Sequence, residues 1–568
     1  MDKRWQRKKI PSTEAIQQLS NEINVNSYLS ALLIQRGVTN FEEARSFFRP
    51  QHEHLYDPFL MKGMEQAVQR LRTAIETGEK ILIYGDYDVD GTTAVALVYS
   101  YLHEIHEHCH VYIPDRYAEG YGVSQLGVEW AEQHGYSLII ALDCGIKAFD
   151  MVKLAHEKGI DFIICDHHLP DSDIPEAVAI LDPKQEDCHY PYSELSGCGL
   201  GFKFMQAYAR RYHNEQEVLK YIDLVAVSIA SDIVPITDEN RTLAYYGLKK
   251  INEDPLPGLK ALKDIAGLRN DLDISAVVFA LGPRINAAGR VAHASAAVEL
   301  LTAHSETEAN ELAGRINVKN EERRQFDSDI TEEALAMIEE NETLRGAKST
   351  VLFKNTWHKG VIGIVAARCV EKYYRPTIIL TESNNKATGS ARSIVGFDLY
   401  QAICECSDLL EKFGGHKYAA GLTLDINNVE AFRRKFEEVV SSTVTEEMLV
   451  PVIDIDLLLN FDAITPKFVN ILKQMGPFGP ENQQPMFEAS GLYVFNSLSS
   501  FKDKHIRFLI GQQGSDAVFQ AVGFDMVAHY SRLAQGDIFK MAFTVEENNY
   551  NGNTSIQLRI KDIKFESA

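Results

Sequence analysis

Cysteine is scarce in this 568-residue chain, which has eight cysteines, scattered and without a Cys-x-x-Cys pair. The scarcity excludes a zinc ribbon and a disulfide framework, and it indicates a reducing compartment such as the cytoplasm. Long apolar runs are also missing, since none approaches the roughly 20 residues that a membrane-spanning helix needs. The basic N-terminus has no apolar segment behind it and so does not resemble a secretory signal. We therefore expect no membrane association.

Positive charge is the second shortage. The 57 lysines and arginines are outnumbered by 80 acidic residues, which gives a net charge of −23. This balance argues against binding of nucleic acid over the whole surface, but it does not exclude a locally basic groove. A polyanionic substrate would have to be bound by a few placed arginines and metal ions. The length exceeds what one core usually organises, so we expect about two to four domains.

Residues from about 65 to 235 alternate between amphipathic helices and short apolar strands. We expect helices at 64–78, 92–107, 123–134 and 149–158, and strands at 80–84, 110–113, 137–142 and 161–165. Such alternation predicts a parallel sheet with helices on both faces. Ligands of these sheets bind beyond the carboxyl ends of the strands, which makes polar residues there the first candidates for a site.

The remaining sequence divides into further parts. The segment 303–347 is rich in Glu, Ala, Arg and Asn and predicts a long connecting helix with a solvated, charged face. A second α/β unit follows at 348–447, and alternating stretches with turn signals predict a small β-barrel at 448–568. A polar helical segment at 1–45 precedes the first α/β domain at 46–302. The expected fold class is therefore α/β, with two α/β domains followed by a barrel.

An acidic triplet stands at the end of the first predicted strand, in the segment Tyr84–Gly91. If the extended geometry continued, Asp86, Asp88 and Asp90 would point to the same side. Three carboxylates that close repel one another unless a cation lies among them, and hard ions such as Mg²⁺ or Mn²⁺ suit them. A calcium-binding EF-hand loop would need an acid at its twelfth position, where this chain has Leu97. A solvated acidic turn stays open as the alternative.

Comparable polar clusters follow other elements of the same region. Asp143 and the run Asp166, His167 and His168 each come directly after an apolar strand, and Asp232 ends a helical stretch. Clusters at successive element ends predict one shared site. Several carboxylates with one or two imidazoles can hold two divalent ions, which activate water and stabilise the leaving oxygen of a phosphate ester.

Several motifs of the chain resemble those of a known family. The segments at 86–91, 142–145, 165–168 and 231–235 resemble the four signatures of the DHH phosphoesterase superfamily. The segment Gly414–Gly421 resembles the nucleic-acid-binding signature of the DHH-associated domain. With Gly282–Arg290 and Trp357–Val365, the set is similar to the RecJ family of bacterial exonucleases. The resemblance implies DHH and DHH-associated domains joined by a long helix around a cleft, followed by an OB-like barrel.

The resemblance also implies roles for individual residues. The metal ligands fall on Asp88, Asp90, Asp143, His167 and Asp232, with Asp143 as the bridge. His168 is implied to contact the scissile phosphate or to act as an acid. Asp86 either supplies a further ligand or supports one, because Tyr84 stands where smaller superfamily members carry a histidine.

The basic and glycine-rich motifs are implied to bind the substrate. Arg116, Ser390 and Arg392 would form a pocket for the 5′-terminal phosphate, since arginine and a hydroxyl suit a dianionic end. Arg116 could instead pair with Asp115 or Glu119. Arg284 would hold the scissile phosphate, and Arg290 would either do the same or form a structural salt bridge. Backbone contacts to the strand would involve His358, Gly415 and His416. We expect His358 and His416 to lie in glycine-rich turns, and a turn-stabilising role is the alternative for these two histidines.

The function implied by this resemblance is hydrolysis of single-stranded DNA from the 5′ end. It would use two Mn²⁺ or Mg²⁺ ions, release mononucleotides, and serve DNA repair and recombination in the bacterial cytoplasm. The resemblance implies a monomer with single-strand-binding protein and a RecQ-type helicase as partners. Two rivals are a phosphatase for short oligonucleotides or cyclic dinucleotides, and a non-catalytic replication scaffold. The barrel region speaks against the first, and the full ligand set speaks against the second.

Overall fold

The computed structural model describes residues 2–550 and 553–566 and divides into two compact units. The smaller unit comprises Met1–Gln6, Arg290–Ala292 and Val318–Ile453. The larger unit comprises Arg7–Gly289, His293–Asn317 and Asp454–Ala568. Each unit is described separately below. No helix in the described ranges is long and apolar enough to cross a membrane.

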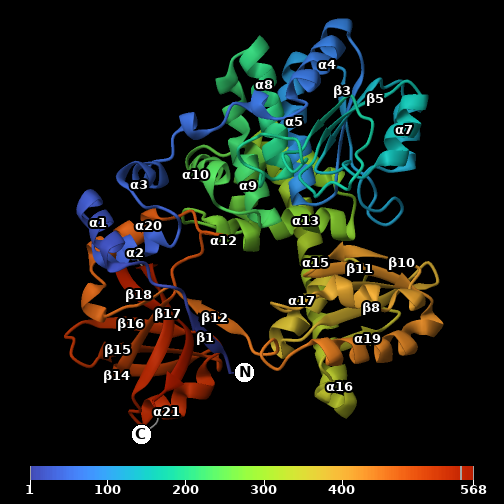
Figure 1. Cartoon of the computed structure of the whole chain (residues 1–568). Helices are drawn as coiled ribbons and strands as arrows, with labels where there is room; N and C mark the ends of the chain where they lie inside the picture. The colour runs from blue at the N-terminus through green and yellow to red at the C-terminus, as the bar shows by residue number, and fades with distance from the viewer. Residues whose placement is uncertain (1, 551–552, 567–568) are drawn as a thin grey trace. The chain divides into compact units, whose positions relative to one another are not determined.

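The larger unit contains a sheet of parallel strands in the order β3-β2-β4-β5-β6. Its strands are β2 (Ile81–Gly85), β3 (Cys109–Tyr112), β4 (Leu138–Leu142), β5 (Asp161–Cys165) and β6 (Ala179–Leu181). Both faces of the sheet are buried, because alternate strand residues belong to two separate apolar clusters. Helices α4 (Met64–Thr77), α5 (Val89–Ile105) and α8 (Gly197–Tyr212) contribute to one cluster, and α6 (Gln125–Gln133) and α7 (Phe149–Glu157) to the other. Figure 1 shows α5 and α7 on opposite sides of the strands.

Further helices complete this domain and lead out of it. After α8 the chain forms α9 (Ile222–Asp232), α10 (Asp238–Glu253), α11 (Pro257–Ile265), α12 (Ile274–Ala276), α13 (Gly282–Val291) and α14 (Ser295–Leu301), with a π-helical turn at Val277–Leu281. The N-terminal helices are α1 (Thr13–Ile23), α2 (Ser27–Ile34) and α3 (Phe41–Phe48). They share an apolar core with the C-terminal domain of the same unit. The N-terminal segment is therefore packed, although its sequence is mostly polar.

The C-terminal domain is a closed β-barrel, which confirms the prediction for this region. Its sheet runs β13-β14-β15-β16-β18-β17, and the pairing of β14 with β17 closes it. The strands are β13 (Leu457–Leu458), β14 (Phe487–Phe501), β15 (His505–Gln512), β16 (Val518–Gly523), β17 (Phe539–Tyr550) and β18 (Asn553–Phe565), accompanied by α20 (Pro466–Gln474) and α21 (Tyr530–Ala534). The long strand β14 was missed by pattern analysis, because register shifts near Asn496 interrupt its alternation.

The smaller unit is built on a mixed sheet in the order β10-β11-β9-β8-β7, in which only β7 and β8 are parallel. The long helix α15 (Glu306–Glu340) leads into it, as the sequence predicts. Its elements are α16 (Glu342–Gly346), β7 (Thr350–Phe353), α17 (Ile362–Tyr373), β8 (Thr377–Ser383), β9 (Lys386–Arg392), α18 (Leu399–Cys404), β10 (Lys412–His416), β11 (Ala419–Leu424) and α19 (Val429–Thr443). Outside these sheets, β1 (Arg4–Arg7) pairs with β12 (Val452–Ile455).

Two local expectations are wrong. The acidic triplet is not extended, because β2 ends at Gly85 and α5 begins at Val89, so Asp88 caps the helix and Asp90 lies in its first turn. The capping carboxylate accepts a hydrogen bond from Gly91 N at 3.1 Å, which favours helix over strand. His416 does not lie within a turn but ends strand β10, paired with Ala419 across a tight hairpin.

Candidate active site

The candidate active site lies at the carboxyl ends of three adjacent strands. Strand β2 leads to Asp86, β4 leads to Asp143, and β5 leads to Asp166 and the two histidines. Because β4 pairs with both β2 and β5, these ends are neighbours. Asp143 has a φ of 59°, an uncommon conformation for a residue that is not glycine, and it turns the chain sharply at the strand end.

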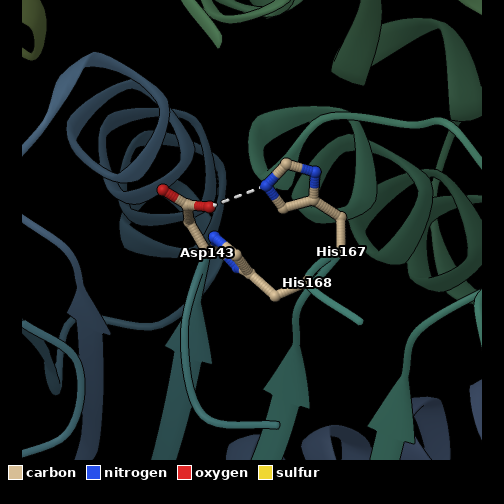
Figure 2. A group of neighbouring side chains, drawn as sticks. All are labelled: Asp143, His167 and His168. Atoms are coloured by element: carbon tan, nitrogen blue, oxygen red, sulfur yellow. Dashed lines mark ion pairs between the residues drawn. The ribbon is translucent and has the colours of Figure 1, made fainter. Parts of the chain in front are cut away.

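Three carboxylates converge on the imidazole of His167. Its Nε2 atom lies 3.2 Å from Oδ1 of Asp143, 3.7 Å from Oδ2 of Asp90 and 3.6 Å from Oδ2 of Asp232. His167, Asp90 and Asp143 are buried, and Asp232 is partly exposed. Figure 2 shows Asp143 and His167 facing each other with His168 beside them. The structure thus brings together the acids that the sequence places more than fifty residues apart.

Asp90 is fixed by the beginning of helix α8. Its two oxygens accept hydrogen bonds from Gly197 N at 2.7 Å and Cys198 N at 2.8 Å. The Ser228 hydroxyl donates a further bond at 2.6 Å. A Cβ atom on Gly197 would lie 2.6 Å from Cβ of Asp143, so only glycine allows this approach. Sequence analysis missed this helix terminus, although Ser196 followed by Gly-Cys-Gly is a recognisable helix start.

Several buried polar atoms of the cluster make no hydrogen bond within the described chain. They are both carboxylate oxygens of Asp86, Oδ1 of Asp143 and both ring nitrogens of His167. Burial and the charge of Asp88 raise the pKa of Asp86, and burial together with Asp90 raises that of Asp143. Burial lowers the pKa of His167, which favours the neutral ring that a metal requires. The donor set therefore fits hard divalent cations, which would remove the repulsion and use the unpaired atoms.

The remaining acids have distinguishable environments. Asp88 caps α5, and burial with the charge of Asp90 raises its pKa. Burial and the charges of Asp90 and Asp88 raise the pKa of Asp232 to about 8, against the opposing charges of His168 and Lys184. Asp90, Asp143, His167, His168 and Asp232 belong to groups whose ligand atoms lie close together, whereas Asp86 and Asp88 belong to neither group. Metal binding by Asp86, which is among the most deeply buried acids of the described chain, and by Asp88 therefore stays a prediction.

His168 is held by Asp166 rather than by another acid of the cluster. Its Nδ1 atom is 2.7 Å from Oδ1 of Asp166, whose carboxylate also accepts bonds from the backbone N of His167, His168 and Ile146. Burial opposes protonation of His168, but the hydrogen bond and charge of Asp166 outweigh it and raise its pKa to about 9. Its half-exposed ring lies 3.2 Å, at Nε2, from the Tyr121 hydroxyl. Tyr121 was not predicted, and only its Gly-Tyr-Gly setting hints at it.

Arg116 lies at the same edge of the sheet. Its guanidinium stands over the ring of Tyr87, 4.7 Å from the centroid, and its charge acts on Asp86. The two acids considered as partners are engaged elsewhere. Asp115 accepts bonds from the backbone of its own turn, and Glu119 accepts from the Tyr112 hydroxyl at 2.9 Å. The position of Arg116 therefore suits an anion better than a local ion pair.

Lys184 is a second basic residue near the cluster, and sequence analysis missed it. It follows β6, the neighbour of β5, and its backbone N donates to Oδ1 of Asp182 at 2.8 Å. Its ammonium pairs with Glu194 at 3.5 Å, and its side chain is 20% exposed. Its charge acts on both His167 and Asp232. A lysine three residues beyond a strand end, directly after Asp-Pro, is the signal that could have found it.

In the smaller unit, Ser390 and Arg392 lie together on β9. The guanidinium of Arg392 donates to the Ser390 hydroxyl at 3.1 Å. Both side chains lie against Gly363 in the first turn of α17, with Ser390 Oγ at 2.9 Å and Arg392 Nη2 at 3.0 Å from the Cβ that this glycine lacks. A hydroxyl, a guanidinium and the start of a helix are together suited to a phosphate group.

The other predicted contacts are spread over several elements. Arg284 donates to Ala280 O at 2.7 Å and to Asn317 Oδ1 at 3.1 Å. Arg290 donates to Gly360 O at 2.9 Å, which supports a backbone-holding role. His358 stacks on Phe326 with ring centroids 4.9 Å apart and accepts a bond from Gly360 N, so it stabilises its turn. Gly415 and His416 are exposed on the β10–β11 hairpin.

Comparison with known proteins agrees with this arrangement of domains. Residues 80–229 match the model of the DHH family N-terminal domain, residues 346–442 the DHHA1 domain, and residues 455–562 the RecJ OB domain. A Bacillus subtilis protein named single-stranded-DNA-specific exonuclease RecJ is 36% identical over 98% of this chain and 70% of its own length. The chain belongs to the RecJ family. A RecJ of Dickeya dadantii is 31% identical over 94% of this chain and 95% of its own length.

Solved structures of RecJ proteins share the fold. The crystal structure of Thermus thermophilus RecJ in complex with Mn²⁺ matches with a TM-score of 0.84 and 25% identity, over 100% of this chain and 80% of that one. A crystal structure of an exonuclease RecJ bound to manganese matches with a TM-score of 0.60 and 30% identity, over 68% of this chain and 96% of that one. The predicted fold, with two α/β domains and an OB-type barrel, is confirmed.

Proposed function

We propose that this RecJ-family chain is a metal-dependent exonuclease specific for single-stranded DNA, which hydrolyses phosphodiester bonds from the 5′ end. The observation that carries the proposal is the convergence of three carboxylates on Nε2 of His167. The curated relatives are named single-stranded-DNA-specific exonucleases, and related crystal structures contain Mn²⁺ or Mg²⁺. We propose release of mononucleotides and a role in DNA repair and recombination.

The proposed metal ligands are Asp88, Asp90, Asp143, His167 and Asp232, with Asp86 as a further candidate. Two divalent ions held by this set would supply an activated water and stabilise charge on the phosphate. The protein's own contribution is to fix the ligands. The start of α8 orients Asp90 through two backbone N–H groups, and the strand-end turn orients Asp143.

His168 is proposed to act on the scissile phosphate or the leaving group. The carboxylate of Asp166 binds its Nδ1 and leaves Nε2 for a substrate oxygen. A ring with a pKa of about 9 carries its proton at neutral pH, so it can donate a hydrogen bond or a proton to an anionic oxygen. Tyr121, within hydrogen-bond distance of that nitrogen, limits the orientations of the ring.

Strand binding is proposed to involve all domains. By the family resemblance, Arg116, Ser390 and Arg392 would recognise the 5′-terminal phosphate, which would give the 5′ polarity. Arg284 and Arg290 would hold the scissile phosphate, and His358, Gly415 and His416 would lie along the strand. On the barrel, Phe495 and Phe524 are exposed, and Arg559 stands over Phe524 at 5.1 Å from the centroid. Exposed aromatic rings next to basic groups suit stacking of single-stranded bases regardless of sequence.

The proposed setting is the bacterial cytoplasm, where the DNA substrate is. All eight cysteines are free, as expected in a reducing compartment. We propose that the protein acts as a monomer, with single-strand-binding protein and a RecQ-type helicase as partners. These partners follow from the family resemblance alone.

The test is the variant Asp143→Ala, assayed with Mn²⁺ on a single strand labelled at its 5′ end. We expect wild type to release the label as a mononucleotide before the strand shortens measurably, and the variant to release none. Asp150→Ala, on the exposed start of α7, is the matched control and should retain full activity. Digestion by Asp143→Ala at the wild-type rate would contradict the proposal. Digestion of dinucleotides but not of long strands would favour the phosphatase alternative.

A further inference from the structure

A loop of the C-terminal domain reaches the segment that follows the proposed ligand Asp232. The loop comprises Met475–Asn482, after helix α20. The backbone N of Ile236 donates to Pro480 O at 2.9 Å. Gly479 packs so closely that a Cβ atom there would lie 2.5 Å from Cγ1 of Ile236. The loop therefore touches the chain four residues beyond Asp232.

The segment after Asp232 has an unfavourable backbone conformation. Ile233, which ends helix α9, has a φ of 60°. A β-branched side chain crowds the backbone in this left-handed region, and such a conformation persists only where surrounding contacts enforce it. The side chain of Ile233 is 66% exposed, so its own packing contributes little. The enforcing contacts must act on the residues that follow.

Contacts from two domains hold those residues. From within the α/β domain, Pro235 O accepts hydrogen bonds from the Tyr192 hydroxyl at 3.3 Å and from Asn240 Nδ2 at 3.0 Å. From the C-terminal domain, Pro480 binds Ile236 as described. The loop is itself anchored, because Arg241 of α10 donates to Met475 O at 3.1 Å and Gly476 O at 2.9 Å.

The loop is also internally braced. Asn482 is buried, and its Nδ2 donates to Met475 O at 3.0 Å and Pro477 O at 2.8 Å. The guanidinium of Arg36 donates to its Oδ1 at 3.0 Å. These hydrogen bonds make the loop rigid, so the loop can fix the position of Ile236 relative to the barrel.

We infer that the 475–482 loop positions Asp232, so that the C-terminal domain contributes to the geometry of the metal centre as well as binding the strand. The inference rests on the proposed function, because it takes Asp232 as a metal ligand. Groups that orient ligands without touching the metal typically change metal affinity or activity by about 10–100-fold when they are replaced. The barrel domain would then set how tightly the site on the Asp232 side binds its ion.

The test measures Mn²⁺ binding directly, by the electron paramagnetic resonance signal of free Mn²⁺, in the full chain without DNA. We expect Gly479→Ala to weaken binding at one site by about tenfold or more, because the new methyl group displaces Ile236. The double variant Gly479→Ala with Ile236→Ala removes the colliding atom and should recover part of the affinity. Asn482→Ala, which loosens the loop without a collision, should shift the affinity in the same direction by less.

Gly511→Ala is the matched control. Its Cβ atom would lie 2.7 Å from the ring of Tyr493 on the neighbouring strand β14, and neither residue belongs to the 475–482 loop. Thermal unfolding of all variants shows which ones fold. If Gly479→Ala fails to fold, Asn482→Ala decides the outcome.

Weaker Mn²⁺ binding by the loop variants but not by Gly511→Ala supports the inference. Wild-type affinity in the folded loop variants overturns it, whereas a wild-type protein that binds no Mn²⁺ overturns the proposed function instead.

Discussion

The Nε2 atom of His167 lies 3.2 Å from Oδ1 of Asp143, and neither atom takes part in a hydrogen bond within the described chain. Buried polar atoms are normally paired, so two unpaired ones facing each other need a reason. A shared cation supplies one, because it would bind both at once. The cluster is therefore arranged to bind metal, and this arrangement lowers the stability of the metal-free protein.

The link between Asp166 and His168 leads to a first prediction. Replacing Asp166 by Asn removes the negative charge that raises the pKa of His168 and leaves fewer acceptors for the backbone N–H groups it binds. We expect kcat to fall by about 10–100-fold, with a smaller effect on Mn²⁺ affinity. The measurement is single-turnover digestion of a 5′-phosphorylated strand together with histidine titration by NMR.

The control for this change is Asp171→Asn, an exposed acid that pairs with Lys147 at 2.8 Å. It should leave kcat unaltered. Equal rates for Asp166→Asn and wild type would contradict a role for Asp166 in orienting His168.

Metal binding should depend on pH in a direction set by the raised pKa values. In the metal-free protein the pKa of Asp232 is about 8, so this carboxyl holds a proton at pH 7, which an ion must displace. Mn²⁺ affinity should therefore rise with pH up to about 8 and then level off, by about tenfold per pH unit for each displaced proton. Calorimetry in buffers of different ionisation enthalpy measures the released protons.

The variant Asp232→Asn provides the comparison for this titration. It has no ionisable carboxyl at that position, so it should bind Mn²⁺ more weakly and release fewer protons. Proton release that is unchanged in Asp232→Asn would assign the titration to other groups.

The sequence predicted the elements around the centre but not the local turn that forms it. The strand ends at Asp143 and His167 follow from apolar runs that the parallel sheet buries on both faces. The acidic triplet was expected to be extended, yet Asp88 caps α5, because a side chain that satisfies backbone N–H groups decides the start of a helix. Because α5 begins at Val89, Asp90 lies in the helix and Asp86 lies before it, so the two carboxylates do not point to the same side as an extended strand would require.

Local sequence patterns did not predict the contacts between residues that are far apart in the sequence. The binding of Asp90 by Gly197 and Ser228 joins three elements that lie more than thirty residues apart, and no local periodicity announces it. Lys184 was missed for the same reason, because its importance comes only from the pairing of β6 with β5. Residues marked by a motif were found, whereas residues marked only by tertiary packing were not.

Lys184 itself allows a further prediction. A positive charge beside Asp232 and His167, in a protein of net charge −23, should attract the phosphates of the strand. Lys184→Met should raise KM by about tenfold, the loss expected for one charge-assisted contact. It should also reduce the slope of log affinity against log salt by about 0.7, the value for one phosphate contact on a single strand.

Lys158→Met is a closely matched control. Lys158 pairs with Glu132 and is 22% exposed, against 20% for Lys184 in its pair with Glu194. It is expected to leave KM and the salt slope at wild-type values. If both lysine variants behave alike, the effect belongs to overall charge and not to the position of Lys184.

The pair Ser390 and Arg392 on β9 predicts that the digestion rate depends on the chemical group at the 5′ end of the strand. Arg392 and Ser390, against the start of α17, present donors suited to a doubly charged phosphate and have less to offer a 5′-hydroxyl. Wild type should therefore digest 5′-phosphorylated strands faster than 5′-hydroxyl strands. Arg392→Gln should reduce this preference by about 10-fold, the loss expected for a bidentate charged contact.

Arg434→Gln is the control, since Arg434 is an exposed arginine of α19, and this variant should keep the preference for 5′-phosphorylated strands. Because a 5′-hydroxyl end lacks the phosphate that these donors would bind, the digestion rate of the hydroxyl-ended strand should be nearly the same in all three proteins. A fall in that rate for Arg392→Gln would indicate damage to the domain rather than loss of phosphate recognition.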